Sequence, residues 1–401
     1  MAVSSRFGGH GPLLFGLAVT RVIGWGSTFY APSVLVGPLE REIGLNAEVV
    51  FAGITILLVT GALIAPAIGR MLDREGTRRA MCVGAVICAL GLAVLSLAQG
   101  PVSYLASWFV IGLGHALSLA NSANVTIAQL MGERTRRAIG LMMLVTGLSS
   151  SVFWPLTAVL TDAFGWRVAL LVFAAMQIVI VLPIFACVPR YRPAPPPAAL
   201  PDVHPAGEYG SVAPASRRAA FWLVALAFSA SGLASWGLPL HLIRLFQEWG
   251  LTQAEAVWVA TLSGPATIAA RAIDATLGER LPVERVALWG LLLGPVLCLA
   301  LPVVPMTITT AAIFVVLFSA VLGVISIARA TLPLALFGRN GFAVVLGKLT
   351  VPQNIAFAAA PLLFAVMVER LGANVTLIVS AAIQAVGFAA MLALVQMVPR
   401  R

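Results

Sequence analysis

Twelve apolar stretches, separated by short polar turns, run along this 401-residue chain. Each is about 20 residues long, the length that a helix needs to cross a hydrocarbon core of roughly 30 Å. Hydrophobic residues make up 60% of the chain and charged residues 10%, far from the composition of an ordinary globular domain. The sequence therefore predicts an all-α membrane protein with 12 transmembrane helices. The expected spans are residues 13–36, 49–68, 80–98, 102–125, 139–160, 168–188, 220–246, 256–277, 286–304, 310–336, 344–367 and 375–397.

Basic residues are concentrated in the turns and tails on one side of the expected bundle. Only Arg41, Arg167, Arg244 and Arg370 fall in the loops of the opposite side. Because cytoplasmic loops are enriched in Lys and Arg, this asymmetry predicts that both termini are cytoplasmic, in a bacterial-type inner (cell) membrane. The basic residues form no continuous face or long run, which argues against nucleic-acid binding.

A polar segment with many prolines divides the expected spans six and six. It covers residues 189–219 and is typical of an extended cytoplasmic linker. We expect an N-terminal six-helix bundle at residues 1–188 and a C-terminal six-helix bundle at residues 220–401.

The two halves show an internal repeat. Residues 44–74 align without a gap on residues 250–280, and the same offset pairs Gly26 with Gly232 and Pro155 with Pro361. Such a repeat implies two pseudo-symmetric bundles with a solute site at their interface near the membrane midplane.

Ionisable residues within the expected spans are the first functional candidates, because a charge at a helix centre costs about 2.5–3.5 kcal/mol on insertion scales. Asp274 lies one helical turn from Arg271, so the two could pair on one face. Protonation of Asp274 would then free Arg271 to hold an anionic solute. A structural ion pair, or an Asp274 hydrated near the cytoplasmic end, is the alternative.

Each of three other ionisable residues has two possible roles. Arg21 and Arg329 either bind solute or extend their guanidinium groups to the lipid headgroups. His115 either takes part in proton coupling, since histidine titrates near neutral pH, or is a packing residue. Uncharged candidates for solute binding are Tyr30, Asn121, Asn124 and Gln353.

A dense charged cluster lies between the second and third spans. It contains Gly69, Asp73, Arg74, Gly76, Arg78 and Arg79. This spacing resembles the loop between the second and third helices of the major facilitator superfamily, whose members are secondary transporters. The resemblance implies a conformational latch, in which the Asp73 carboxylate accepts hydrogen bonds from a helix N-terminus or from an arginine of the other half. A basic turn that only sets topology is the alternative.

Two stretches are similar to the monocarboxylate and oxalate/formate branch of that superfamily. They are residues 26–44 and residues 240–256, the latter followed by Arg271. The resemblance implies that Arg271 binds a substrate carboxylate. The chain departs from the branch at Thr267, where monocarboxylate transporters often have an aspartate, and at Trp108, near the place of an arginine common in proton-coupled members.

The leading hypothesis is a secondary active transporter, a symporter or antiporter, that moves a small anionic organic solute by alternating access, with proton coupling left open. Efflux of a toxic drug or metalloid is the alternative, although residues 147–155 lack the GxxxGPxxGG pattern of drug/proton antiporters. A membrane sensor without transport is a third option.

We expect no enzyme activity and no cofactor, because no nucleophile, base and orienting acid occur together. Four cysteines lie singly within apolar spans, so neither a disulfide framework nor a metal site is indicated. The expected partners are a small-molecule solute and membrane lipid, with protons as an option, and the protein is expected to be a monomer.

Overall fold

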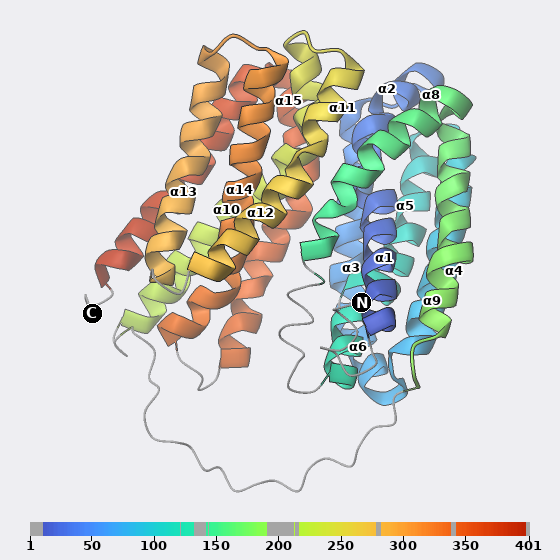
Figure 1. Ribbon diagram of the computed structural model, residues 1–401, viewed down its shortest axis with the longest axis horizontal. Coiled ribbons are helices and arrows are strands. Elements are labelled where there is room, and N and C mark those ends of the chain that lie inside the picture. Colours follow the sequence, from blue (N-terminus) through green and yellow to red (C-terminus); the bar gives the residue numbers. More distant parts are fainter. Residues whose placement is uncertain are drawn as a thin grey trace, which may run out of the picture. The chain divides into compact units, whose positions relative to one another are not determined.

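A computed structural model of the chain describes residues 11–120, 122–131, 142, 144–190, 212, 216–277, 282–337 and 342–397. Every element in these ranges is helical (Figure 1). The chain divides into two compact units, Met1–Pro195 and Pro196–Arg401, each treated by itself below. The boundary falls within the proline-rich segment.

Unit 1 consists of helices interrupted by three short π-helical segments. In Figure 1, α8 turns back on itself at the upper end of this unit. Its elements are α1 (Gly11–Trp25), η2 (Gly26–Tyr30), α2 (Pro32–Ile43), α3 (Ala47–Glu75), α4 (Thr77–Ser96), α5 (Pro101–His115), η3 (Ala116–Ala120), α6 (Ser122–Met131), α8 (Leu148–Met176), η5 (Gln177–Val181) and α9 (Leu182–Ala186).

Unit 2 is built mainly from long helices. Its first helix packs along its last, and α12 packs against α14. The elements are α10 (Arg217–Glu248), α11 (Gln253–Thr261), α12 (Ser263–Leu277), α13 (Val283–Ala300), the 3₁₀ segment η8 (Leu301–Val303), α14 (Ile308–Phe337) and α15 (Phe342–Met397).

Among the described residues, ten helical runs are long and apolar enough to cross a membrane. Two of them, Leu144–Ala186 with 43 residues and Lys348–Met397 with 50, are about twice the length that one crossing needs. Each is broken by a glycine with positive φ, Gly165 at 82° and Gly372 at 76°, a conformation that side chains with a Cβ rarely adopt. Since each long run supplies two crossings, the prediction of 12 transmembrane helices is confirmed.

The internal repeat is visible in the local structure of the two units. Gly44 and Gly250, paired by the sequence alignment, both have positive φ directly after the first helical run of their unit. Two residues later, Asn46 and Thr252 cap the next helix: Asn46 Oδ1 accepts from Val49 N–H at 3.0 Å and Thr252 Oγ1 from Glu255 N–H at 3.3 Å. The same turn chemistry therefore starts the second crossing of each unit.

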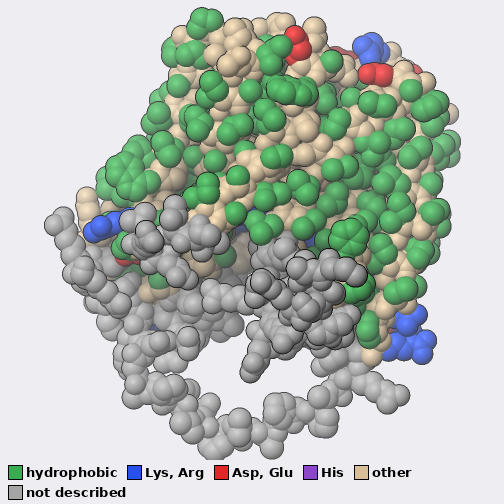
Figure 2. Space-filling model, viewed as in Figure 1, with side chains coloured by type: hydrophobic (Ala, Val, Ile, Leu, Met, Phe, Trp, Pro, Cys, Tyr) green, Lys and Arg blue, Asp and Glu red, His purple; other side chains and the backbone are tan. Residues whose placement is uncertain are grey.

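Hydrophobic side chains dominate the outer surface of the helices. Leu63, Leu97, Val102 and Val303 are each more than 70% exposed. On the face shown in Figure 2, green side chains cover the described flank of the helices, and the coloured charged groups lie toward its edges. A surface of this kind requires lipid as its solvent, so the protein is a multi-pass membrane protein.

Candidate functional site

Unit 2 brings two of the sequence-predicted arginines together. Arg271 on α12 and Arg329 on α14 are both half-buried. Arg271 Nε donates a hydrogen bond to Ser326 Oγ at 3.2 Å, and Ser326 lies one helical turn before Arg329. Because α12 packs against α14, the two arginines lie in the same contact region between these helices. The arrangement concentrates positive charge at one place in this unit.

Aromatic rings hold the Arg329 side chain. Its guanidinium carbon lies 4.9 Å from the centroid of the Phe357 ring on α15, in cation–π contact. Phe357 in turn stacks on Trp236 of α10, with the centroids 5.1 Å apart and the planes 9° from parallel. Gly232, one turn before Trp236, permits this approach, because a Cβ there would overlap the Phe357 ring. The stack fixes where the Arg329 charge is presented.

The expected pair of Arg271 and Asp274 is not formed. Both side chains are described, and no ion pair joins them. Arg271 turns instead toward Ser326 on the neighbouring helix, while Asp274 lies half-buried near the end of α12. Spacing along one helix permitted the pair, but the facing helix offered Arg271 another acceptor.

Unit 1 holds the third predicted arginine. Arg21 on α1 is 7% exposed, and its Nε donates to Thr146 Oγ1 at 3.1 Å. Trp25, one turn later, meets the imidazole of His115 edge-on, with ring centroids 4.8 Å apart. His115 is buried, and its Nε2 has no hydrogen-bond partner among the described residues. His115 thus contacts Trp25, and Arg21 lies one turn before Trp25 on the same helix.

The π-helical segments of unit 1 adjoin this cluster. His115 is followed at once by η3, and Trp25 by η2. In the third segment, η5, Gln177 Nε2 donates to Ser27 Oγ of η2 at 3.3 Å. Single π-turns within α-helices occur frequently at functional sites.

Tyr30, at the end of η2, is another of the sequence-predicted binding residues. Its ring meets Trp154 of α8 edge-on at 5.5 Å, and Trp154 Nε1 donates to its backbone oxygen at 3.1 Å. These contacts fix the end of η2 against α8.

The remaining predicted residues are not assembled into a site by the described structure. Gln353 lies buried on α15. Asn121 lies outside the described residues, as does the side chain of Asn124 on α6.

In the charged turn, a single residue, Gly76 with φ 77°, separates α3 from α4. The side chain of Arg78 is half-buried and that of Arg79 is exposed. Gly69, Asp73 and Arg74 belong to α3, but their side chains lie outside the described part, so the latch stays a prediction.

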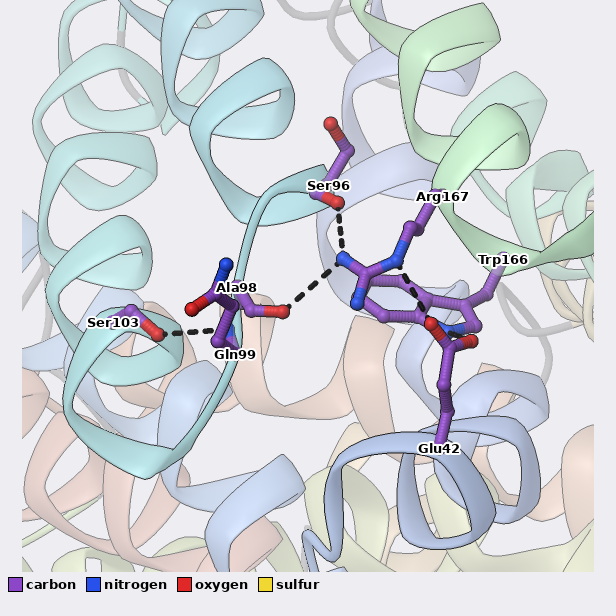
Figure 3. Close-up of polar contacts among 7 residues, drawn as sticks. All are labelled: Glu42, Ser96, Ala98, Gln99, Ser103, Trp166 and Arg167. Carbon is purple, nitrogen blue, oxygen red and sulfur yellow. Dashed lines mark hydrogen bonds and ion pairs between the residues drawn. The ribbon is translucent and has the colours of Figure 1, made fainter.

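A cluster that the sequence analysis did not single out lies at the end of the first crossing (Figure 3). The Glu42 carboxylate accepts from Trp166 Nε1 at 2.5 Å and pairs with Arg167 Nε at 2.9 Å. Arg167 Nη1 also donates to the backbone oxygens of Ser96 at 2.6 Å and Ala98 at 3.1 Å. One arginine therefore ties together the ends of α2 and α4 and the start of the sixth crossing.

Unit 2 repeats the connection with different atoms. Glu248, 206 positions after Glu42, accepts from the backbone N–H of Ala373 at 3.0 Å. The neighbouring Trp249 Nε1 donates to Asn374 Oδ1 at 3.1 Å, and Arg244 pairs with Glu369 at 2.8 Å. The signal was present in the sequence as a glutamate at the same place in both repeats.

The fold and the arginines inside the spans define a polytopic helical membrane protein of the transporter class. A family model described as Major Facilitator Superfamily matches residues 14–246, more than half of the chain, and the chain belongs to this family. Its members are transporters and not enzymes, in agreement with the sequence-based expectation.

Several relatives of the chain are monocarboxylate transporters. The chain is 25% identical to monocarboxylate transporter 13 of Bos taurus over 228 residues, covering 56% of this chain and 52% of the relative. It is 29% identical to monocarboxylate transporter 11 of Homo sapiens over 225 residues, covering 55% and 47%. The chain thus spans about half the length of the curated relatives it matches.

A solved structure supports the fold over nearly the whole chain. It is the crystal structure of a bacterial homolog to the human lysosomal transporter Spinster, in an inward-facing and occupied conformation. The TM-score is 0.75 over 97% of each chain, at 14% sequence identity, so this likeness concerns the fold alone.

Proposed function

We propose that this protein is a secondary active transporter of a small anionic organic solute, operating by alternating access. In this mechanism the solute site opens to each side of the membrane in turn. The observation that carries the proposal is the pair of arginines, Arg271 and Arg329, on the membrane-crossing helices α12 and α14, which pack against each other, with Arg271 bound to Ser326 one turn before Arg329.

Electrostatics favours an anion as the transported solute. An arginine within a membrane span is expensive and is therefore retained mainly for function. Arg21, Arg271 and Arg329 all lie within candidate spans, whereas Asp274, at the edge of its span, forms no ion pair with Arg271. An entering carboxylate would supply negative charge where cations are gathered, through the bidentate geometry that guanidinium groups provide. The monocarboxylate transporters among the relatives support the same class of solute.

Transport by purified protein in proteoliposomes tests the proposal. We expect saturable uptake of at least one labelled short carboxylate, such as acetate, lactate or pyruvate. Arg271→Gln should lower uptake at subsaturating solute about 10-fold or more, because a hydrogen bond to a charged group contributes roughly 1.5–3 kcal/mol. Arg218→Gln, which removes an exposed arginine at the start of α10, is the matched control and should transport normally. Absence of carboxylate transport, or full activity of Arg271→Gln, would refute the proposal.

We also propose proton coupling, with Asp274 and His115 as the candidate proton carriers. Uptake into the same liposomes should then rise when the proton gradient is directed inward, and substitution of the carrier should abolish that rise. If instead a drug or metalloid is transported and no carboxylate competes with it, the efflux alternative replaces our proposal.

A further inference from the structure

The hydroxyl group of Ser326 on α14 has two defined partners. Its Oγ donates to the backbone oxygen of Gly323, three residues earlier on the same helix, at 2.6 Å. A serine hydroxyl carries one proton, and the bond to Gly323 uses it, so toward any other group Oγ can only accept. Nε of Arg271 on α12 donates to this oxygen at 3.2 Å. The directions of both hydrogen bonds are therefore fixed.

The helices α12 and α14 approach each other closely at the level of this contact. A Cβ at Gly323 would lie 2.9 Å from the backbone oxygen of Thr267 and 3.3 Å from the Cβ of Ala270, one residue before the arginine. Thr267 Oγ1 also donates to the backbone oxygen of Ser319 on α14, at 3.2 Å. These contacts hold the two helices together, so the serine hydroxyl is presented to the arginine at a defined place.

The contact restricts how Arg271 can bind an anion. A guanidinium group can pair with a carboxylate through Nε and one Nη, or through its two Nη atoms. In Arg271 the Nε–H is already donated to Ser326. A carboxylate therefore approaches this arginine through the Nη edge. Because serine is uncharged, its bond orients the guanidinium plane without cancelling the positive charge.

We infer that Ser326 is a positioning residue of the solute site, whose hydroxyl turns the Nη edge of Arg271 toward the solute carboxylate. The inference rests on the proposed function, since it takes Arg271 as a group that binds the solute. Ser326 acts through the arginine and not through a contact of its own with the solute. Positioning strengthens binding, because a side chain that is already held loses less conformational entropy when the solute arrives.

Uptake kinetics in proteoliposomes test the inference, with labelled acetate, lactate and pyruvate as probes. Ser326→Ala should raise the KM about 10-fold, as for the loss of one hydrogen bond to a charged group, and should change the maximal rate less than about 2-fold. Ser326→Thr keeps the hydroxyl, which threonine in a helix also bonds to a carbonyl one turn earlier, and should keep the KM within about 3-fold of the original.

Ser107→Ala is the matched control. The Ser107 hydroxyl on α5 also donates to a backbone oxygen one turn earlier, that of Ser103, at 2.7 Å. Its removal should leave the KM and the maximal rate unchanged. The unfolding temperature of each variant checks that the protein folds.

Combining Ser326→Ala with Arg271→Lys separates positioning from a general structural role. Lysine keeps the charge but lacks the planar fork that the serine holds. If Ser326 acts through Arg271, adding Ser326→Ala to Arg271→Lys should change solute affinity less than about 2-fold. Affinity is measured here as a dissociation constant by thermal-shift titration with the same carboxylates, which does not require transport.

Three results would overturn the inference: Ser326→Ala behaves like Ser107→Ala, Ser326→Thr raises the KM as much as Ser326→Ala, or Ser326→Ala weakens affinity equally with and without Arg271→Lys. In each case carboxylate transport stands and only the role of the serine is lost. If the unmodified protein takes up none of the probes, the proposed function fails, and the inference fails with it.

Discussion

At the scale of single residues, one glycine in the first crossing of each unit allows an aromatic ring to pack closely against that crossing. Gly26 faces Phe153 in unit 1, and Gly232 faces Phe357 in unit 2, each so closely that a Cβ would overlap the ring. The repeat in the sequence paired these two glycines. The rings they admit could not be predicted, because Phe153 and Phe357 lie more than 100 residues away and no local pattern marks them as partners.

Gly232→Ala is expected to destabilise the protein by about 1–3 kcal/mol, the usual cost of overpacking. The added methyl group would push Phe357 away from Trp236 and displace Arg329. The measurement is the midpoint of thermal or denaturant unfolding in detergent. Gly37→Ala, in a helix with nothing within 4 Å of the added Cβ, is the control and should be neutral or slightly stabilising. Equal behaviour of the two variants would contradict this account of the stack.

At the scale of elements, the sequence predicted the membrane spans but not which side chains contact one another. The lengths of the apolar stretches predicted the crossings. In the structure, glycines break the two longest helical runs, at Gly165 and Gly372. The π-helical segments left no common sequence signature, since their sequences GSTFY, ALSLA and QIVIV share no pattern. Helical spacing allowed Arg271 to pair with Asp274, but Ser326 on another helix receives a hydrogen bond from Arg271. Which helix faces which is a tertiary property that spacing along one helix cannot supply.

The connection made by Glu42 should stabilise unit 1 measurably. Glu42→Ala leaves the indole N–H of the buried Trp166 without its acceptor, which costs about 1–3 kcal/mol. Glu42→Gln keeps an acceptor and loses only a partly exposed ion pair, worth about 0–1 kcal/mol. Both are measured as shifts in unfolding midpoint. Glu40→Ala, two residues earlier and exposed, is the control. If the Glu42→Ala midpoint equals that of Glu40→Ala, the contact with Trp166 does not contribute to stability.

At the scale of the whole molecule, the sequence predicted the class and the number of crossings because lipid imposes strict length and polarity limits on each span. The same physics predicts how the chain is oriented. Arg41, Arg167, Arg244 and Arg370 fall together on the side poor in basic residues, which the positive-inside rule assigns to the exterior.

The orientation is testable by cysteine accessibility in intact cells. In a Cys187→Ser background, Glu40→Cys should react with a membrane-impermeant maleimide added from outside. Glu75→Cys, at the end of α3, should react only after the cells are permeabilised. Both native residues are exposed, so both labels have access to the position. The opposite pattern would reverse the topology and would place the charged turn outside the cell.

The single-residue break at Gly372 also has a mechanical meaning. The eleventh crossing, which carries Phe357 and Gln353, and the twelfth crossing are joined by one residue instead of a loop. A connection of one residue contains no loop that could absorb a movement of one helix relative to the other. We therefore expect any tilt of the eleventh crossing to be transmitted directly to the twelfth.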